Sequence, residues 1–279
     1  MRRLNLCALL WISGCLGTLG LWHENLHATT RVALLDTGCA LENVKGVSFT
    51  SNSPFDDPSG HGTMMAKIIR EVNPRSELII VKVANHSYDF SSHTVARGLQ
   101  WCLENNIDVI NLSFTTDESD EVRLVIGRLI QRGVTIIAAV GNCSSKTGFV
   151  VKSDNMVYRA SDLRETGFPA NIDEVIAAGA VNMWGGRAEY ARNTGEIATD
   201  GKWFFEKGTS ISSARLSGYA SLLKEQYPHL TNKEIRVLLH YLARNKKESQ
   251  YLSKEMVQNG LRTNLLACLD GECRIAMAK

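Results

Sequence analysis

Three short fragments of the chain carry residue types that together could perform nucleophilic catalysis. Each places a reactive side chain beside a glycine: Asp36-Thr37-Gly38, His61-Gly62-Thr63 and Gly208-Thr209-Ser210. A serine hydroxyl is a weak nucleophile at neutral pH, so it needs a base that takes its proton and a third group that orients the base. We therefore interpret Asp36, His61 and Ser210 as candidates for these roles. Their order along the chain excludes the chymotrypsin-type order (His, Asp, Ser) and the α/β-hydrolase order (Ser, Asp, His).

The residues around each fragment predict elements that would position these side chains. Arg31–Leu35 is an apolar run typical of a buried parallel strand, and it ends at Asp36, at the strand end where open α/β sheets place their sites. Apolar residues at helical spacing follow His61, over 64–69, and Ser210, over 211–227. Ser210 would then lie at a helix N-terminus, whose free N–H groups and positive dipole end stabilise an oxyanion.

A fourth element supplies a candidate oxyanion donor. Val134–Val140 is a second apolar strand, and it ends at Gly141-Asn142. The side-chain amide of Asn142 could bind the oxyanion of a tetrahedral intermediate. Losing such a donor costs on the order of 3–4 kcal/mol of transition-state stabilisation.

These residues lie in stretches that resemble the subtilisin-like serine proteases, or subtilases. In chain order the matching stretches are Val32–Gly38, Gly60–Ala66, Leu78–Val83, Asn106–Ser113, Ile137–Asn142, Phe168–Ala170 with Val175–Val181, and Gly208–Gly218. Ordered matches that extend from about residue 31 to 243 are far more specific than one tripeptide. The resemblance implies a three-layer α/β fold, with a mostly parallel central β-sheet flanked by helices.

The resemblance also implies roles for individual residues in a serine endopeptidase that acts on proteins or peptides without a cofactor. Asp36 would orient His61, His61 would be the general base and then the acid, and Ser210 would be the nucleophile. Asn142 and the Ser210 N–H would bind the oxyanion. Substrate backbone would pair with Ser113, Phe114 and Thr115, and Ala139 to Gly141 would face them across the primary specificity pocket.

The chain departs from the family pattern at the specificity pocket and after His61. Thr115 and Thr116 follow Phe114 where the family usually has two glycines. We expect these side chains to narrow the pocket and to favour a small residue before the cleaved bond. The short segment between His61 and Leu78 leaves little room for a calcium loop, so we expect no metal. We interpret Asp56-Asp57 as a solvated turn.

The first residues predict export. Met1–Arg3 is basic, the next residues are apolar, and Ile12-Ser13-Gly14-Cys15 resembles a bacterial lipobox. We expect a signal peptide over 1–14, lipid on Cys15, a linker over 15–30 and a membrane-anchored lipoprotein. Three other interpretations stay open: an uncleaved anchor over Leu4–Leu21, ordinary cleavage after Leu26–Ala28, and an incidental cysteine. About 15 residues then precede the first strand, too few for a folded prodomain, so a separate inhibitor or folding partner could replace one.

The remaining cysteines are expected to be structural. Cys268 and Cys273 flank the turn signal Asp270-Gly271, and in an exported chain we expect them to form a small disulfide loop. We interpret Cys102 as a core residue, and Cys39 and Cys143 as packed or disulfide-bonded.

Bulk composition fits one catalytic domain. The chain has 279 residues, 44% of them hydrophobic, and a formal net charge of +2, which gives no reason to expect a nucleic-acid partner. We expect the catalytic domain over 31–244 and a helical or loop appendage over 245–279. A peptide-binding pseudoprotease and an esterase-type hydrolase remain alternatives, because acyl-transfer chemistry serves esters as well as peptides.

Overall fold

The computed structural model describes residues 29–87, 89–143, 149–151, 157–159, 165–246, 249–263 and 265–269. The predicted signal peptide, Cys15 and Cys273 lie outside these residues. A nine-stranded sheet forms the centre of the molecule, in the order β12-β13-β9-β8-β5-β4-β1-β3-β2. Its strands are β1 (Arg31–Asp36), β2 (Lys45–Ser48), β3 (Glu77–Lys82), β4 (Val109–Leu112), β5 (Thr135–Ala139), β8 (Ile176–Val181), β9 (Ile197–Asp200), β12 (Arg244–Lys246) and β13 (Ser249–Tyr251).

The central strands are mostly apolar because both faces of the sheet are covered. In β1, Val32 and Leu34 belong to one hydrophobic core, whereas Ala33 and Leu35 belong to the other. Successive side chains of a strand point to opposite faces, so a strand between two layers needs apolar residues at every position. In this sheet, each pair of neighbouring strands along the run β9-β8-β5-β4-β1-β3-β2 is parallel.

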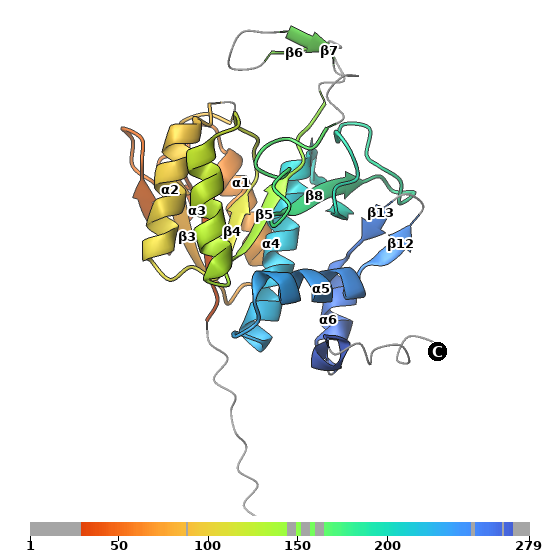
Figure 1. The fold of residues 1–279 in the computed structure, drawn as a ribbon. Coiled ribbons are helices and arrows are strands. Elements are labelled where there is room, and N and C mark those ends of the chain that lie inside the picture. Colours follow the sequence, from red (N-terminus) through yellow and green to blue (C-terminus); the bar gives the residue numbers. More distant parts are fainter. Residues whose placement is uncertain are drawn as a thin grey trace, which may run out of the picture.

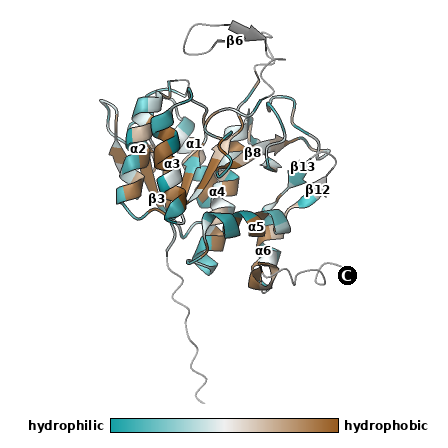
Figure 2. Ribbon diagram, in the orientation of Figure 1, coloured by the Kyte–Doolittle hydropathy of each residue, from teal (hydrophilic) through white to brown (hydrophobic). Residues whose placement is uncertain are grey.

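Helices cover the two faces, which confirms the predicted three-layer α/β fold. α2 (Ser92–Glu104) and α3 (Asp120–Gln131) lie side by side on one face (Figure 1). The other face is covered by α1 (His61–Val72), α4 (Thr209–Gln226), α5 (Asn232–Leu242) and α6 (Lys254–Gly260). Figure 2 shows the hydrophobic strands between helices whose outer faces are hydrophilic. Short hairpins pair β6 (Phe149–Val151) with β7 (Val157–Arg159), and β10 (Lys202–Trp203) with β11 (Glu206–Lys207).

The order of the strands reverses at β1. β3, which follows α1, pairs with one edge of β1, and β4, which follows α2, pairs with the other. The connections after β1 and β4 therefore diverge, and a crevice forms outside the carboxyl ends of these strands. Asp36 is the last residue of β1 and Ser113 follows the last residue of β4.

Helix α4 is buried around most of its circumference, because it packs between the sheet and the outer helices. Its first five residues, 209 to 213, are all buried. Small residues permit this close packing: a Cβ on Gly218 would lie 2.6 Å from the Cβ of Val72 in α1. The buried Asn111 of β4 accepts hydrogen bonds from Ser213 (3.1 Å) and Ser217 (3.0 Å) of α4.

The segment after residue 244 shares the sheet and core of the catalytic domain. The boundary that the sequence suggested falls at the first residue of β12, which pairs antiparallel with β13. Tyr251 of β13 pairs with Ala198 of β9, and Leu252, Val257 and Leu265 are fully buried in the core beneath α4 and α5. The described part of 245–279 is therefore integrated into the domain rather than attached to its surface.

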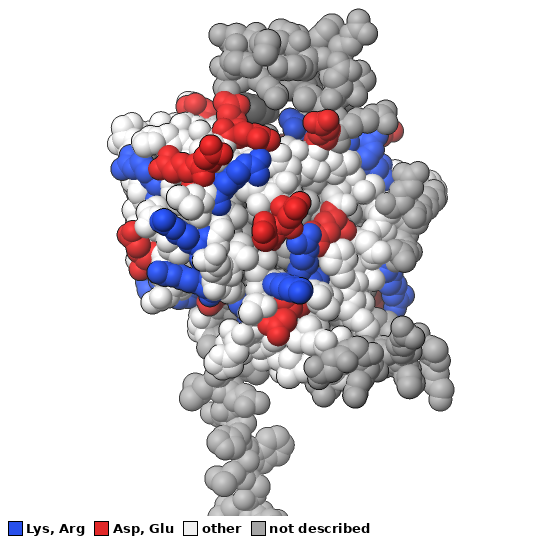
Figure 3. All heavy atoms as spheres, in the orientation of Figure 1, with Lys and Arg blue, Asp and Glu red and all other residues white. Residues whose placement is uncertain are grey.

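The surface of the face that carries α2 and α3 has both signs of charge interspersed, with acidic side chains gathered along its upper edge (Figure 3). Among the described helices, none combines the length and hydropathy that crossing a membrane requires.

Replacing Leu252 by alanine tests whether the C-terminal segment belongs to one cooperative domain. Leu252 is fully buried, so Leu252→Ala should lower the free energy of unfolding by about 2–5 kcal/mol, measured by urea denaturation, with one transition retained. Leu266→Ala in the same segment is the control, because Leu266 is 41% exposed and should change the free energy little. A near-neutral effect of Leu252→Ala would contradict the shared core.

Candidate active site

Asp36 and His61 form a buried acid–imidazole pair. Asp36 is fully buried, and its Oδ1 lies 2.7 Å from His61 Nδ1. The same oxygen accepts the Thr37 backbone N–H at 2.8 Å. A carboxylate on Nδ1 holds the proton there, which leaves the Nε2 lone pair free to act as a base on its other side.

Two glycines allow α1 to approach this pair. A Cβ on Gly62 would lie 2.1 Å from the Gly38 carbonyl oxygen and 3.2 Å from Asp36 Oδ1. Gly38 has a φ of 115°, and a Cβ there would lie 2.4 Å from the Asp56 carbonyl oxygen. The Gly62 N–H donates to Thr37 Oγ1 at 3.0 Å. Gly62 is therefore required by contact between the β1 turn and the first turn of α1, and Gly38 by its positive φ and its contact with the loop at Asp56.

Asp57 fixes the start of α1. Its Oδ2 accepts from the Thr63 N–H at 2.7 Å and from the Thr63 hydroxyl at 2.5 Å. Its Oδ1 accepts from the Thr37 hydroxyl at 2.8 Å and from the Gly60 N–H at 3.1 Å. The expected solvated turn thus contains a residue that ties the Asp36 turn to the His61 helix. In the sequence, the signal for this helix cap is an acidic residue shortly before the predicted start of the helix.

Lys82 is a second buried charge that the sequence did not single out. It is the last residue of β3, fully buried, and its Nζ donates to the Thr37 carbonyl oxygen and, at 2.9 Å, to the Asp56 carbonyl oxygen. Burial lowers the pKa of this ammonium, opposed by the charges of Asp57, Asp56 and Asp36. Lys82 joins the two loops that flank the Asp36–His61 pair.

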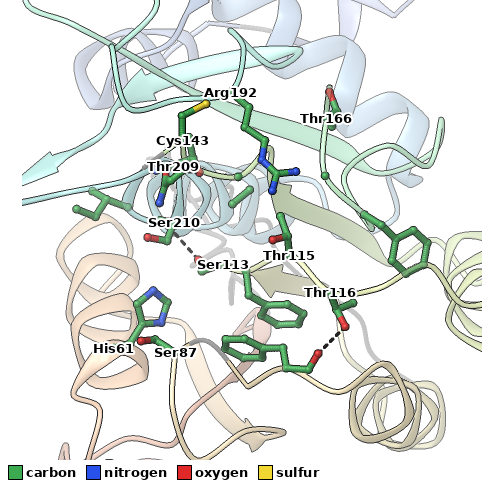
Figure 4. A pocket seen from close by; sticks show the side chains of 18 of the residues that line it. His61, Ser87, Ser113, Thr115, Thr116, Cys143, Thr166, Arg192, Thr209 and Ser210 are labelled. Carbon is green, nitrogen blue, oxygen red and sulfur yellow. Dashed lines mark hydrogen bonds between the residues drawn. The ribbon is translucent and has the colours of Figure 1, made fainter. Parts of the chain in front are cut away.

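Ser210 lies in the first turn of α4 and is hydrogen-bonded to the residue that follows β4. Its carbonyl oxygen accepts the Ser113 hydroxyl at 2.9 Å, and Ser113 Oγ accepts the Asn111 amide at 2.8 Å. Ser210 and His61 line one cleft of about 710 Å³. Figure 4 shows the imidazole of His61 pointing toward Ser210. The structure therefore brings the three candidates from β1, α1 and α4 to one place.

Asn142 points its amide nitrogen into the same cleft. Its Oδ1 accepts from the Thr209 N–H (2.9 Å) and the Thr209 hydroxyl (3.0 Å), so hydrogen bonding assigns Nδ2 to the other side. A Cβ on Gly208 would lie 3.0 Å from Ser210 Oγ and 3.3 Å from Asn142 Nδ2. The missing side chain of Gly208 thus leaves open a small space between the hydroxyl and the amide donor.

The residues expected to bind substrate all line the cleft, but their side chains differ in how far they are exposed. They are Ser113, Phe114, Thr115, Ala139 and Gly141. Phe114 is buried and stacks on Phe90, with ring centroids 4.0 Å apart. Thr115 is partly exposed, and its Cγ2 lies 2.5 Å from where a Cβ on Gly167 would stand. The Thr116 hydroxyl donates to the Phe90 carbonyl oxygen at 2.5 Å.

Comparison with known proteins agrees with this arrangement. Residues 28–259 match the model of the subtilase family. The chain belongs to the subtilase family.

The relatives of this subtilase include bacterial proteases. A thermostable alkaline protease from Halalkalibacterium halodurans is 30% identical over 240 residues, which is 76% of this chain but only 62% of that protein. Subtilisin DY from Bacillus licheniformis is 28% identical over 258 residues, 82% of this chain and 89% of the relative. Family membership and these relatives support a serine-type endopeptidase.

Solved structures show the same fold. The nisin leader peptidase NisP from Lactococcus lactis superposes with a TM-score of 0.67 at 16% identity, over 83% of this subtilase and 87% of that chain. The protein therefore has the subtilisin-like fold that its sequence resembles.

The cysteines of the subtilase lie apart from the proposed chemistry, except for Cys143. Cys39 and Cys102 are buried thiols, and burial raises the pKa of both. Cys143 lines the cleft. Cys268 is disulfide-bonded, and Cys273, its expected partner, lies outside the described residues. Within the described ranges, no group of three or more His, Cys, Asp or Glu side chains is arranged to hold a metal ion.

His61 has a raised pKa. Burial of the imidazole lowers the pKa, but the charge of Asp36, the hydrogen bond to Asp36 and the charge of Asp57 raise it, and the net value lies above the ordinary 6.5. A general base must be neutral, so a function that depends on His61 would be lost as the pH falls through this raised pKa.

Removing the charge of Asp36 should reverse this shift. In Asp36→Asn the imidazole is still buried, which lowers its pKa, but its attraction to the Asp36 carboxylate is lost. The pKa of His61 should therefore fall relative to the wild type, as measured by NMR titration of the imidazole. Asp120→Asn, which removes an exposed carboxylate at the start of α3, is the control and should leave the titration unchanged. An unchanged or higher pKa in Asp36→Asn would show that Asp36 does not control the imidazole.

Proposed function

We propose that this subtilase cleaves peptide bonds with Ser210 as the nucleophile, His61 as the general base and acid, and Asp36 as the orienting group. The observation that carries the proposal is the 2.7 Å contact between Asp36 Oδ1 and His61 Nδ1, in a cleft that also holds Ser210 and Asn142. An acid, a base, a nucleophile and an oxyanion donor converge at one cleft, as acyl transfer requires.

The acylation step follows from this geometry. His61 Nε2 takes the proton of the Ser210 hydroxyl as Oγ attacks the substrate carbonyl carbon. The carbonyl π electrons move to oxygen and form a tetrahedral oxyanion. The intermediate collapses when His61 gives its proton to the leaving amine nitrogen, which breaks the C–N bond and leaves an acyl group on Ser210. His61 then activates a water molecule, and the same sequence releases the acid and regenerates the hydroxyl.

The oxyanion would be stabilised by two donors and a helix. Asn142 Nδ2 and the Ser210 N–H lie on either side of the space left by Gly208, and α4 begins at Thr209. The helix N-terminus contributes the positive end of its dipole where negative charge develops. Because Asn142 Oδ1 is engaged by Thr209, the amide is already oriented before the oxyanion forms.

Ser210→Ala tests the assignment of the nucleophile. We expect loss of labelling by a serine-directed phosphonate probe and a fall in kcat of about a millionfold on a peptide library read by mass spectrometry. The fold should survive, as judged by circular dichroism. Ser51→Ala, at an exposed serine away from the cleft, should label and cleave like the wild type.

Other outcomes of the same experiment point to other functions. Undiminished labelling of Ser210→Ala would overturn the nucleophile assignment. A folded wild type that binds peptides without cleaving them or taking the label would be a peptide-binding pseudoprotease. Labelling together with hydrolysis of esters alone would indicate an esterase.

We also propose that the protein is exported and held at a membrane by lipid on Cys15. The support is the basic start of the chain at Met1–Arg3, the apolar run after it and the small residues Ser13-Gly14 before the cysteine. Several acyl chains on one cysteine would anchor stably, whereas a single chain binds reversibly.

Cys15→Ala tests the lipid anchor. The variant should lose incorporation of radiolabelled palmitate and leave the membrane fraction, whereas Cys7→Ala in the same leader should keep both. Membrane association of Cys15→Ala would instead indicate an uncleaved apolar anchor, and a wild type free of label and membrane would indicate ordinary cleavage.

A further inference from the structure

A cationic side chain lies beside the predicted specificity pocket, at a position that the sequence motifs do not mark. The chain after β5 forms an antiparallel bridge between Asn142 and Ala191. On one side of this bridge the Arg192 N–H donates to the Gly141 carbonyl oxygen at 3.1 Å. The bridge therefore places Arg192 next to Gly141, a wall of the cleft.

Two glycines make room for the guanidinium. A Cβ on Gly141 would lie 2.8 Å from Arg192 Nε, and a Cβ on Gly167 would lie 2.9 Å from Arg192 Nη1. That second Cβ would also lie 2.5 Å from Thr115 Cγ2, so Thr115 borders the same space. Figure 4 shows the guanidinium pointing toward Thr115. Arg192 thus occupies the space between the wall at Gly141 and the wall at Thr115.

The guanidinium has no partner among the residues that the structure describes. Arg192 Nε is buried without a hydrogen bond, and the side chain forms no ion pair with a described carboxylate. The buried cations Lys82 and Lys224 each donate to two backbone carbonyl oxygens. The Arg192 guanidinium is partly buried and has five donors, so without a described partner it favours an anion.

Burial also affects the charge of this group. Desolvation lowers the pKa of Arg192, opposed by Cys143, but an arginine remains protonated at neutral pH. The planar guanidinium fork matches a carboxylate, with which it forms two parallel charge-assisted hydrogen bonds. Asp117, Glu118, Glu165 and Glu206 also line the cleft and disfavour an acidic substrate side chain near them, whereas Arg192 favours one beside Gly141.

We propose that Arg192 makes this subtilase selective for peptides with aspartate or glutamate immediately before the cleaved bond. The proposal rests on the peptidase function above, and it replaces the expectation of a small residue with that of an acidic one. The substrate carboxylate would reach the guanidinium from the cleft and pair with it where it lies between Gly141, Gly167 and Thr115. Thr115 narrows this space with its Cγ2 methyl group.

Matched peptides test the proposal. We would measure kcat/KM for internally quenched peptides that differ only before the cleaved bond, where they carry Glu, Gln, Asp, Asn, Ala or Leu. The wild type should cleave the Glu peptide at least about tenfold faster than the Gln peptide, as expected for a hydrogen bond to a charged group. In Arg192→Met this ratio should fall to about one, and Arg192→Lys should restore part of it.

Lys207→Met is the matched control, because Lys207 is another cation that lines the cleft. Its Glu-to-Gln ratio should stay within about twofold of the wild type, which would localise the effect to Arg192. A wild type that does not prefer Glu over Gln, or a preference that persists in Arg192→Met, would overturn the proposal while leaving the peptidase function standing. Arg192→Gln is the second neutral variant should the methionine variant fail to fold.

Binding to the Ser210→Ala variant separates this proposal from the peptidase function. Fluorescence anisotropy with the Glu and Gln peptides reports recognition without chemistry. If no peptide is cleaved and the probe does not label Ser210, the peptidase function fails. Tighter binding of the Glu peptide to Ser210→Ala, lost when Arg192→Met is added, would still support Arg192 as the recognition residue, and equal binding would overturn it.

Discussion

The site of this subtilase depends on a carboxylate that is wholly removed from water. Asp36 is fully buried at the end of a central strand, and its hydrogen bonds are made by Oδ1, whereas Oδ2 is buried without a partner. The Thr37 N–H and the His61 imidazole supply contacts at 2.8 and 2.7 Å. For the imidazole to reach it, α1 must begin against the β1 turn, which is why glycine stands at 62.

The other half of the site is held by the central helix α4. Its N-terminal turn contains Ser210, which lines the cleft. That turn is held by the hydrogen bond from the Ser113 hydroxyl to the Ser210 carbonyl oxygen and by the hydrogen bond from the Thr209 N–H to Asn142 Oδ1. The serines of α4 hydrogen-bond to Asn111 of β4, so a helix buried on most sides still satisfies its polar groups. Ser210 and His61, the proposed nucleophile and base, thereby lie in helices rather than in free loops, which suits preorganised catalysis.

The cleft combines two opposite electrostatic environments. Around His61 the charges of Asp36 and Asp57 favour the imidazolium form, which the proposed mechanism requires when Ser210 loses its proton. Between Gly141 and Gly167, the guanidinium of Arg192, which has no partner among the described residues, would favour the proposed substrate carboxylate. The same cleft can therefore support proton transfer on one side and recognition of a carboxylate on the other, because the two charged regions come from different walls.

The sequence alone determined the parallel α/β fold and marked Asp36, His61, Ser210 and Asn142 as candidates, which the structure brings together. These residues lie in short motifs at the ends of strongly apolar strands and helices. The local sequence pattern that predicts these elements therefore also marks the residues that meet at the site. Only the tertiary structure showed that Asp57 caps α1, that 249–252 completes the sheet and core, and that Arg192 enters the cleft. Arg192 reaches Gly141 through a bridge between distant segments, and such pairing leaves no periodic signal near either residue.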